Sequence, residues 1–433
     1  MLGLGPSATE PKPAMHDFLL RTSTLWIIMI ALALGGAAFF TWIDPPKPRT
    51  AYEVPRAAGT LSPEGLQNLT GRLAREAVAK GVPGIDVLVI RNGGVAARMA
   101  TGERVAGSQV RVGPNDLWHI GSCAKAMTAT MIARLAERGI VGLDDTMETL
   151  FPDLAGGMNP VLGKATLAQL LSHSAGIRDP ESLADVRYMT RGAKGVVAER
   201  AAIAKEILRT PPVVQPGTGF LYSNFGYVVA AAAAERATGK PWEELMREEV
   251  FVPLGMPSAG FGAPGASRPI DSTSAQSAPG GAGEIDQPRG HAMEAGRLTA
   301  AAPDAPQADN PAYLGPAGTV RLAMGDWARF AIDQAEGAHG RGKLLAPETY
   351  RRMQTPALAG GNYGLGWGVK RDAGAIPLVL THNGSNGLWS ADVHAYPQSG
   401  LIVLIAANRG DGTADAAVGA LRKDLVDALD PKR

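Results

Sequence analysis

Strand patterns lie at the two ends of this chain, while helical patterns fill its middle. Near the start, "IDVLVI" (residues 85–90) and "VAARMAT" (residues 95–101) flank an Asn-Gly pair that is typical of a hairpin turn. Near the end, "WSADVHAY" (residues 389–396) and "LIVLIAAN" (residues 401–408) flank "PQSG", which indicates a second hairpin. Because strands need partners, the pattern predicts one antiparallel sheet built from both chain ends, with a helical insertion between them.

Helices are expected beside both hairpins. Ser62 is suited to an N-cap, with Pro63 at the first helical position and leucines following at helical spacing. A final helix is predicted from about Ala414, with its apolar residues on one face. Residues from about 122 to about 330 show mostly helical and loop patterns, so the expected fold class is α/β of the α+β kind.

Composition excludes several classes of function. The formal net charge of the 433 residues is +1, and no block of like charge is present, so we expect no nucleic-acid partner. Neither a phosphate-binding Gly-Lys-Ser/Thr loop nor a paired-histidine metal motif occurs, and we expect no metal and no organic cofactor. Cys123 is the one cysteine, so no intramolecular disulfide can form. It is interpreted as a small buried side chain, and a nucleophilic thiol is the alternative.

The N-terminal part is predicted to hold the chain at a membrane. Residues 1–24 form a tail, and "LWIIMIALALGGAAFFTWI" (residues 25–43) is uncharged and long enough to span a bilayer, with Trp26 and Trp42 near its ends. A cleaved signal and a buried core helix are the alternatives. The Pro-rich residues 44–60 are interpreted as a tether, and residues 61–433 as the functional domain. Within it, the Gly-, Ala-, Ser- and Pro-rich residues 262–283 are expected to form a surface loop.

Ser122 and Lys125 form the first candidate catalytic pair. Their spacing of three places both side chains on one face of a helix, about a turn apart. A serine hydroxyl needs a neighbouring base, and a lysine amine can serve when burial lowers its pKa. The apolar residues around Lys125 supply such burial. The alternative is a helix-capping serine beside a surface lysine.

Two later motifs strengthen the catalytic interpretation. Tyr222 and Asn224 form the Tyr-x-Asn of "LYSNFGY", where a phenol can relay a proton and an amide can hold a carbonyl. The stretch His382-Asn383-Gly384-Ser385 precedes an antiparallel strand, where a glycine allows close approach and the next N–H can face an oxyanion. A helix start with buried aromatics and a tight polar turn are the respective alternatives.

These three elements in this order resemble the serine β-lactamase and penicillin-binding-protein superfamily. The similarity is greatest to its class C-like branch, which includes D-alanyl-D-alanine carboxypeptidases, β-lactamases and esterases. The resemblance covers about residues 61 to 430 and includes "LAQLLSHSAGI", "GLDDTMETLFPDL", "AGTVRLAMGDWARF" and "YGLGWGV". It implies a β-lactamase/transpeptidase-like fold, in which helices flank the antiparallel sheet. An all-helical subdomain, about residues 122–330, completes that fold, and the active site lies between the two parts.

The resemblance also implies roles for individual residues. Ser122 would be acylated, Lys125 would set its protonation state, and Tyr222 would shuttle the proton as base and then acid. Asn224 would bind the substrate amide or carbonyl. His382 would take the place of the family's basic residue.

The resemblance further places an oxyanion hole at the backbone N–H groups of Ser122 and Ser385, with Gly384 allowing the substrate to approach. His173 in "LSHSAG" corresponds to a structural residue of the family rather than to a member of a Ser-His-Asp triad.

The third element departs from the family pattern because it begins with histidine instead of lysine. Histidine is mostly neutral at pH 7 and binds a carboxylate less well than lysine does. We therefore expect esters or peptide-like amides as substrates rather than efficient β-lactam hydrolysis.

The sequence predicts a membrane-anchored serine hydrolase that forms an acyl-enzyme on Ser122, of the esterase or D-amino-acid carboxypeptidase type. A β-lactamase proper and a non-catalytic penicillin-binding-like sensor are the alternatives. The catalytic domain is expected outside the cytoplasm, in the periplasm, or secreted if the signal is cleaved.

Overall fold

The computed structural model describes residues 61–266, 285–370 and 378–429. The predicted tail, apolar segment and tether, residues 1–60, lie outside these ranges, as does most of the predicted loop at residues 262–283. None of the helices in the described ranges combines the length and apolar character needed to cross a bilayer. The predicted anchor at residues 25–43 therefore stays a prediction.

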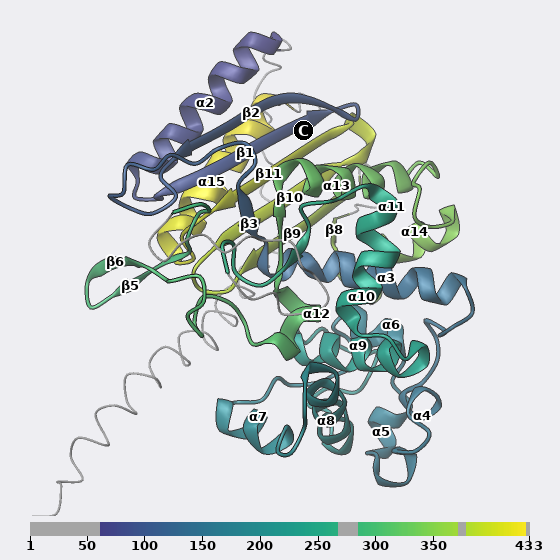
Figure 1. Cartoon of the computed structure of the whole chain (residues 1–433). Coiled ribbons are helices and arrows are strands. Elements are labelled where there is room, and N and C mark those ends of the chain that lie inside the picture. Colours follow the sequence, from purple (N-terminus) through teal and green to yellow (C-terminus); the bar gives the residue numbers. More distant parts are fainter. Residues whose placement is uncertain (1–60, 267–284, 371–377, 430–433) are drawn as a thin grey trace, which may run out of the picture. The chain divides into compact units, whose positions relative to one another are not determined.

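The central sheet joins the two ends of the chain, as the strand patterns predicted (Figure 1). The strand order is β2-β1-β11-β10-β9-β8, and all neighbours are antiparallel. Ile85 of the first hairpin pairs with Ala407 of the last strand. The strands are β1 (Gly84–Arg91), β2 (Gly94–Gly102), β8 (Gly368–Lys370), β9 (Val379–Ser385), β10 (Ser390–Tyr396) and β11 (Leu401–Ala407).

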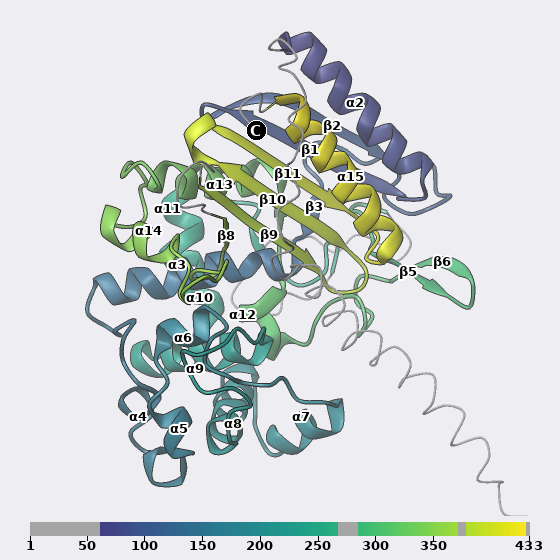
Figure 2. The same cartoon turned by 180° about the vertical axis from the view of Figure 1, so that it is seen from behind.

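Helices cover both faces of this sheet. Helices α2 (Pro63–Ala79) and α15 (Gly412–Leu429) pack on one face, and α15 faces the viewer in Figure 2. Helix α13 (Met324–Gly337) packs on the other face. Because both faces are covered, every residue of β10 and β11 is buried. The predicted cap of α2 is confirmed, since the Ser62 hydroxyl accepts a hydrogen bond from Gly65 N at 3.0 Å.

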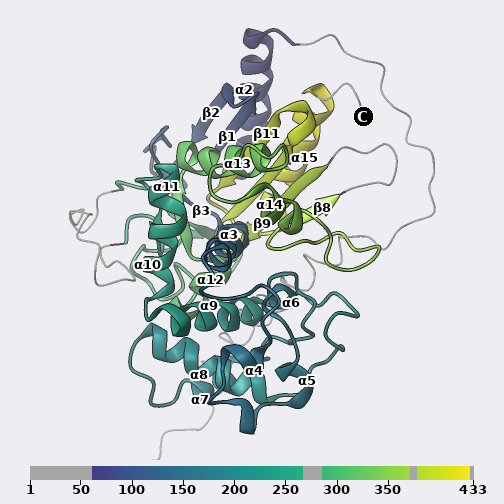
Figure 3. The ribbon, with the colours of Figure 1, turned by 90° about the vertical axis from the view of Figure 1, so that its right-hand side faces the viewer.

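A helical part lies beside the sheet, and Figure 3 shows α3 (Ala124–Glu137) along its axis between the two. The other helices are α4 (Met147–Leu150), α5 (Pro160–Gly163), α6 (Leu167–Leu171), α7 (Leu183–Met189), α8 (Val196–Arg209), α9 (Asn224–Thr238), α10 (Trp242–Met246), α11 (Val252–Leu254), α12 (Gly315–Gly318) and α14 (Pro347–Met353).

The range predicted as all-helical, about residues 122–330, is not helical throughout. Its later part contains short strands. Helix α13, which begins inside this range, packs against the main sheet. Strand β7 (Val320–Ala323) pairs with β4 (Gly260–Phe261) and with β3 (Leu117–His119), which precedes this range. These partners lie far away in the sequence, so local patterns do not reveal them. Strands β5 (His291–Glu294) and β6 (Arg297–Ala300) form a separate local hairpin.

Candidate active site

Ser122 lies in a single 3-10 turn, Gly121–Cys123, that leads directly into α3. Lys125 follows in the first turn of α3, and its Nζ lies 3.1 Å from Ser122 Oγ. The Lys125 side chain is fully buried, so the alternative of a surface lysine is wrong. The spacing of three residues predicted a shared face, and the structure confirms it.

Lys125 is held by acceptors on two other elements. Its Nζ donates hydrogen bonds to Asn224 Oδ1 and to the Ala317 carbonyl, both at 2.8 Å. Burial lowers the pKa of Lys125 to about 7, although the nearby Asp179 carboxylate acts in the opposite direction. Near neutral pH a large fraction of the amine is therefore neutral. Its two N–H groups then point at these carbonyl oxygens, which leaves the lone pair for the Ser122 hydroxyl.

Tyr222 completes the contacts of the serine. Its phenol donates a hydrogen bond to Ser122 Oγ at 2.9 Å. Burial raises the pKa of Tyr222 well above its usual value, so the phenol keeps its proton at neutral pH. The position of Tyr222 is set by α9, whose N-cap is Ser223 and whose first residue is Asn224. In the Tyr-x-Asn motif, the tyrosine therefore lies in a loop, and the next two residues are the N-cap and the first residue of a helix.

His382 does not offer a positive charge to a substrate. It lies on β9 and is only 5% exposed. Its Nε2 lies 2.9 Å from the Tyr363 hydroxyl, and its Nδ1 lies 2.6 Å from the Asn383 carbonyl. Burial, followed by the charge of Lys125, lowers the pKa of His382 to about 3. The ring is neutral at physiological pH, and both of its nitrogens have partners inside the protein.

Gly384 and Ser385 bring β9 against the Gly121–Cys123 turn that holds Ser122. A Cβ on Gly384 would lie 2.1 Å from the Ile120 carbonyl oxygen and 2.8 Å from Ser122 N. A Cβ on Gly121, which has a φ of +49°, would lie 2.5 Å from Ser385 N. The two backbones therefore touch without side chains between them. This contact places the backbone nitrogens of Ser122 and Ser385 close together, as an oxyanion hole requires.

His119 supports the same turn, a role that sequence reasoning missed. The Gly121 N–H donates to His119 Nδ1 at 3.2 Å, and His119 Nε2 lies 2.6 Å from Asp309 Oδ1. His119 is fully buried and Asp309 is 11% exposed, and the pair holds one backbone group of the turn. The sequence showed only that His119 abuts Ser122, because Asp309 is remote in the chain.

Asp179 is a second residue that sequence reasoning missed. Its carboxylate receives hydrogen bonds from the Ser223 hydroxyl, the Asn224 and Phe225 backbone N–H groups, and the Asn224 side-chain amide. Asp179 lies 44 residues before Ser223, in a loop that follows the "LSHSAG" stretch. No motif singles it out.

His173 packs against Tyr222 instead of joining a Ser-His-Asp triad. Its ring centroid lies 4.1 Å from that of Tyr222, and its Nδ1 accepts a hydrogen bond from Ser223 N at 3.1 Å. Burial lowers the pKa of His173 far below its usual value, so it is neutral. The contacts agree with the predicted structural role.

Cys123 is a buried residue of the turn, as its interpretation from the sequence proposed. It is 2% exposed, and its Sγ lies 3.5 Å from the His382 carbonyl oxygen. Burial raises the pKa of Cys123 well above its usual value, so it stays a thiol. The alternative of a nucleophilic cysteine is therefore wrong.

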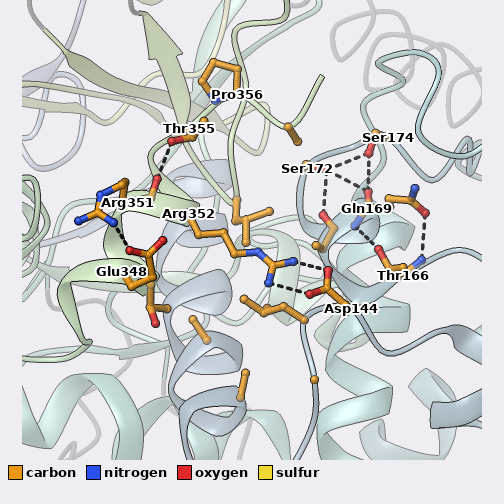
Figure 4. Close-up of a pocket in the computed structure, with 18 of the residues that line it drawn as sticks. Asp144, Thr166, Gln169, Ser172, Ser174, Glu348, Arg351, Arg352, Thr355 and Pro356 are labelled. Carbon is orange, nitrogen blue, oxygen red and sulfur yellow. Dashed lines mark hydrogen bonds and ion pairs between the residues drawn. The ribbon is translucent and has the colours of Figure 1, made fainter. Parts of the chain in front are cut away.

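A cavity of about 920 Å³ lies toward the other end of α3 (Figure 4). Arg352 and Asp144 form an ion pair across it, and Ala133 and Glu137 of α3 belong to its lining. None of the predicted site residues lines this cavity. Among residues 61–266, 285–370 and 378–429, no group of His, Cys, Asp or Glu side chains is arranged to hold a metal ion.

Comparisons with known proteins show the family and the fold. A family model described as "Beta-lactamase" matches residues 70–428. Penicillin-binding protein 4 of Amycolatopsis lactamdurans is 25% identical over 343 residues, which are 77% of this chain and 82% of that protein. Lovastatin esterase of Penicillium rubens is 29% identical over 181 residues, which are 37% of this chain and 44% of the esterase.

The solved structures show the same fold. The D-amino acid amidase from Ochrobactrum anthropi aligns with a TM-score of 0.63 at 22% identity. The alignment covers 84% of this chain and 97% of the amidase.

Proposed function

This chain belongs to the β-lactamase family, and from that premise we propose that it is a membrane-anchored serine hydrolase that forms an acyl-enzyme on Ser122. One observation carries the proposal: Ser122 Oγ lies between the phenol of Tyr222, at 2.9 Å, and the buried amine of Lys125, at 3.1 Å. A serine needs an adjacent base to become a nucleophile, and this arrangement supplies one.

Acylation begins with the neutral amine of Lys125. As the bond between Ser122 Oγ and the substrate carbonyl carbon forms, the hydroxyl proton passes to Lys125 Nζ. The carbonyl oxygen gains a negative charge and is stabilised by the N–H groups of Ser122 and Ser385. The leaving group then departs with the phenolic proton of Tyr222, and the Lys125 ammonium restores that proton.

Deacylation reverses this order. A water molecule in the place of the leaving group passes a proton through Tyr222 to Lys125, while its oxygen attacks the acyl carbon. Ser122 Oγ then leaves and takes a proton from Lys125 Nζ. Because the raised pKa keeps the free Tyr222 protonated, this scheme makes Lys125 the base that starts the cycle.

The substrate class follows from His382 and Asn224. A buried neutral His382 gives no cation for a terminal carboxylate, which favours neutral esters and peptide-like amides over β-lactams. Asn224 Nδ2 uses one N–H on Asp179, and its second N–H is chemically able to hold a substrate carbonyl.

A D-amino-acid carboxypeptidase is the second candidate. It is favoured by the similarity to a penicillin-binding protein, which extends over 77% of this chain. In either case we propose that the apolar residues 25–43 anchor the chain and that the catalytic domain lies in the periplasm, or is secreted after signal cleavage.

The test is covalent labelling of the full chain with a fluorophosphonate, measured as intact mass. We expect one adduct on the wild type and none on Ser122→Ala. Ser399→Ala, which changes a serine of the β10–β11 turn, is the matched control and should label normally.

Screening of neutral esters, D-alanyl peptides and β-lactams, in that order, then separates the two candidates. Turnover of esters but not of peptides with a free carboxylate would support the esterase. Absence of an adduct on folded wild-type protein would instead indicate a binding module on the same fold.

A further inference from the structure

Asp179 contacts three consecutive residues at the start of α9. Its Oδ1 accepts hydrogen bonds from the Ser223 hydroxyl at 2.6 Å and from Phe225 N at 3.0 Å. Its Oδ2 accepts from Asn224 N at 3.0 Å and from Asn224 Nδ2 at 3.1 Å. A carboxylate has room for this many donors, whereas a neutral amide has one acceptor oxygen. The negative charge also lies at the N-terminus of a helix, where it is favourable.

These bonds fix which way the Asn224 amide faces. Since Nδ2 donates to Asp179, Oδ1 must point to the opposite side, where it accepts the 2.8 Å hydrogen bond from Lys125 Nζ. The same contacts hold the backbone that immediately follows Tyr222. The Asp179 carboxylate therefore positions both Asn224 and Tyr222 near Ser122. Its hydrogen bonds go to Ser223, Asn224 and Phe225, and not to Ser122 or Lys125.

Asp179 also supplies charge to the surroundings of Lys125. The titratable groups that act on Lys125 or lie against it include Cys123, His173, Asp179, Tyr222, Tyr227 and His382. Burial raises the pKa of the thiol and of both phenols and lowers the pKa of both histidines, so these five groups are neutral near pH 7. Within this described set, the negative charge comes from Asp179.

We propose that Asp179 is a positioning residue for the chemistry of Ser122: its carboxylate orients Asn224 and the Tyr222 loop, and its charge keeps the ammonium form of Lys125 accessible. This inference rests on the proposed function. The ammonium form matters because Lys125 must return a proton in each half-reaction. An amine that is neutral at every working pH could accept the serine proton less readily.

The experiment compares two variants of the full chain across a range of pH. Asp179→Asn keeps the shape and removes the charge, and Asp179→Glu keeps the charge but moves it by one methylene. The readout is the rate of fluorophosphonate labelling of Ser122. Asp185→Asn is the matched control, since Asp185 caps the neighbouring helix α7 through Ser182 and does not contact Asn224.

For Asp179→Asn we expect two separate changes. The plateau rate at high pH falls about tenfold or more, because Asn224 and Tyr222 lose their orientation. The midpoint of the pH profile moves to lower pH, because loss of the negative charge disfavours the ammonium form of Lys125. For Asp179→Glu the plateau falls and the midpoint stays near that of the wild type. Asp185→Asn should match the wild type in both.

A purely structural role would lower the folded fraction without moving the midpoint. Wild-type plateau and midpoint in folded Asp179→Asn would overturn the inference while leaving the proposed function intact. If Asp179→Asn does not fold, the plateau of folded Asp179→Glu decides, and an undiminished rate overturns the inference. If the wild type itself does not label, the proposed function fails, and this inference fails with it.

Discussion

At the scale of single residues, Lys125 has the environment that a catalytic base requires. It is fully buried, and its Nζ lies within hydrogen-bonding distance of oxygen atoms of Ser122, Asn224 and Ala317. Burial disfavours the charged amine, while the charge of Asp179 favours it. The balance places the pKa of Lys125 at about 7, in the range where a base can both take and return a proton.

A rise of acylation rate with pH is the direct consequence. Below its lowered pKa of about 7, Lys125 is an ammonium and has no lone pair for the Ser122 proton; above it, the amine is neutral. We expect the labelling rate to increase with pH and to level off above a midpoint near 7. Rates of fluorophosphonate labelling between about pH 5 and about pH 9 measure this. A rate that is flat, or that falls as pH rises, would contradict the role of Lys125 as base.

A substitution at Gly384 tests the contact between β9 and the Gly121–Cys123 turn. In Gly384→Ala, the new methyl group would lie 2.1 Å from the Ile120 carbonyl oxygen, so either β9 or the turn must move. We expect labelling of Ser122 to slow by about 100-fold, because a shift of about 1 Å in a catalytic group has this effect.

The control is Gly419→Ala within α15, where a Cβ meets nothing within 4 Å. It should leave labelling unchanged and raise the melting temperature, since alanine favours a helix over glycine by about 1 kcal/mol. Wild-type labelling by Gly384→Ala would show that the close approach is not needed.

At the scale of elements, a buried ion cluster ties α8, α9 and α10 together. Arg200 of α8 is fully buried and forms ion pairs with Glu235 of α9 at 2.6 Å and with Glu243 of α10 at 2.8 Å. Because α9 also begins at Asn224, this cluster anchors the helix that presents the Asn224 amide. Removing one partner of a buried ion pair leaves an uncompensated charge.

Arg200→Met is therefore expected to lower the free energy of unfolding by about 3–5 kcal/mol at neutral pH. The loss should become smaller in acid, because burial raises the pKa of Glu235 and that carboxyl can then take up a proton. Urea unfolding at several pH values measures both effects. Arg72→Met, which removes a solvent-exposed ion pair with Glu76, is the control and should change little. An Arg200 variant as stable as that control would contradict the anchoring role.

At the scale of the whole described unit, the site exists only where distant segments meet. Ser122 precedes α3, Tyr222 precedes α9, and Ser385 ends β9, whose sheet also includes β1 from the start of the domain. The pairing of β1 with β11 joins the strands from the two parts of the chain into one sheet. It runs from Ile85 with Ala407 to Arg91 with Leu401. The proposed oxyanion hole therefore depends on a sheet that neither chain end can build alone.

Hydrogen exchange should reflect this pairing of β1 with β11. Strand β11 lies between β1 and β10, and all of its residues are buried, so its amides open only when the sheet does. We expect the slowest exchange in β1, β10 and β11, and faster exchange in α7, which has one buried residue. Mass spectrometry of peptides after exchange measures this order. Slower exchange in α7 than in β11 would contradict it.

Local patterns predicted much of this molecule because they rest on periodicity and short-range chemistry. The alternation and turns of the two hairpins, the cap at Ser62, and the shared face of Ser122 and Lys125 are all visible within a few residues. The order of Ser-x-x-Lys, Tyr-x-Asn and His-x-Gly was enough to name the family, and the match over residues 70–428 confirms it.

Charge states and supporting contacts were decided by the tertiary structure. The sequence indicated that His382, in the place of the family's basic residue, is mostly neutral at pH 7, and burial and the charge of Lys125 lower its pKa further, to about 3. Asp179 and Asp309 are ordinary loop residues in the sequence, and each acquires its role from a partner far along the chain. The sequence by itself determined which residues are available for catalysis. Only the tertiary structure decided their protonation and orientation, because desolvation and long-range hydrogen bonds arise when distant segments pack together.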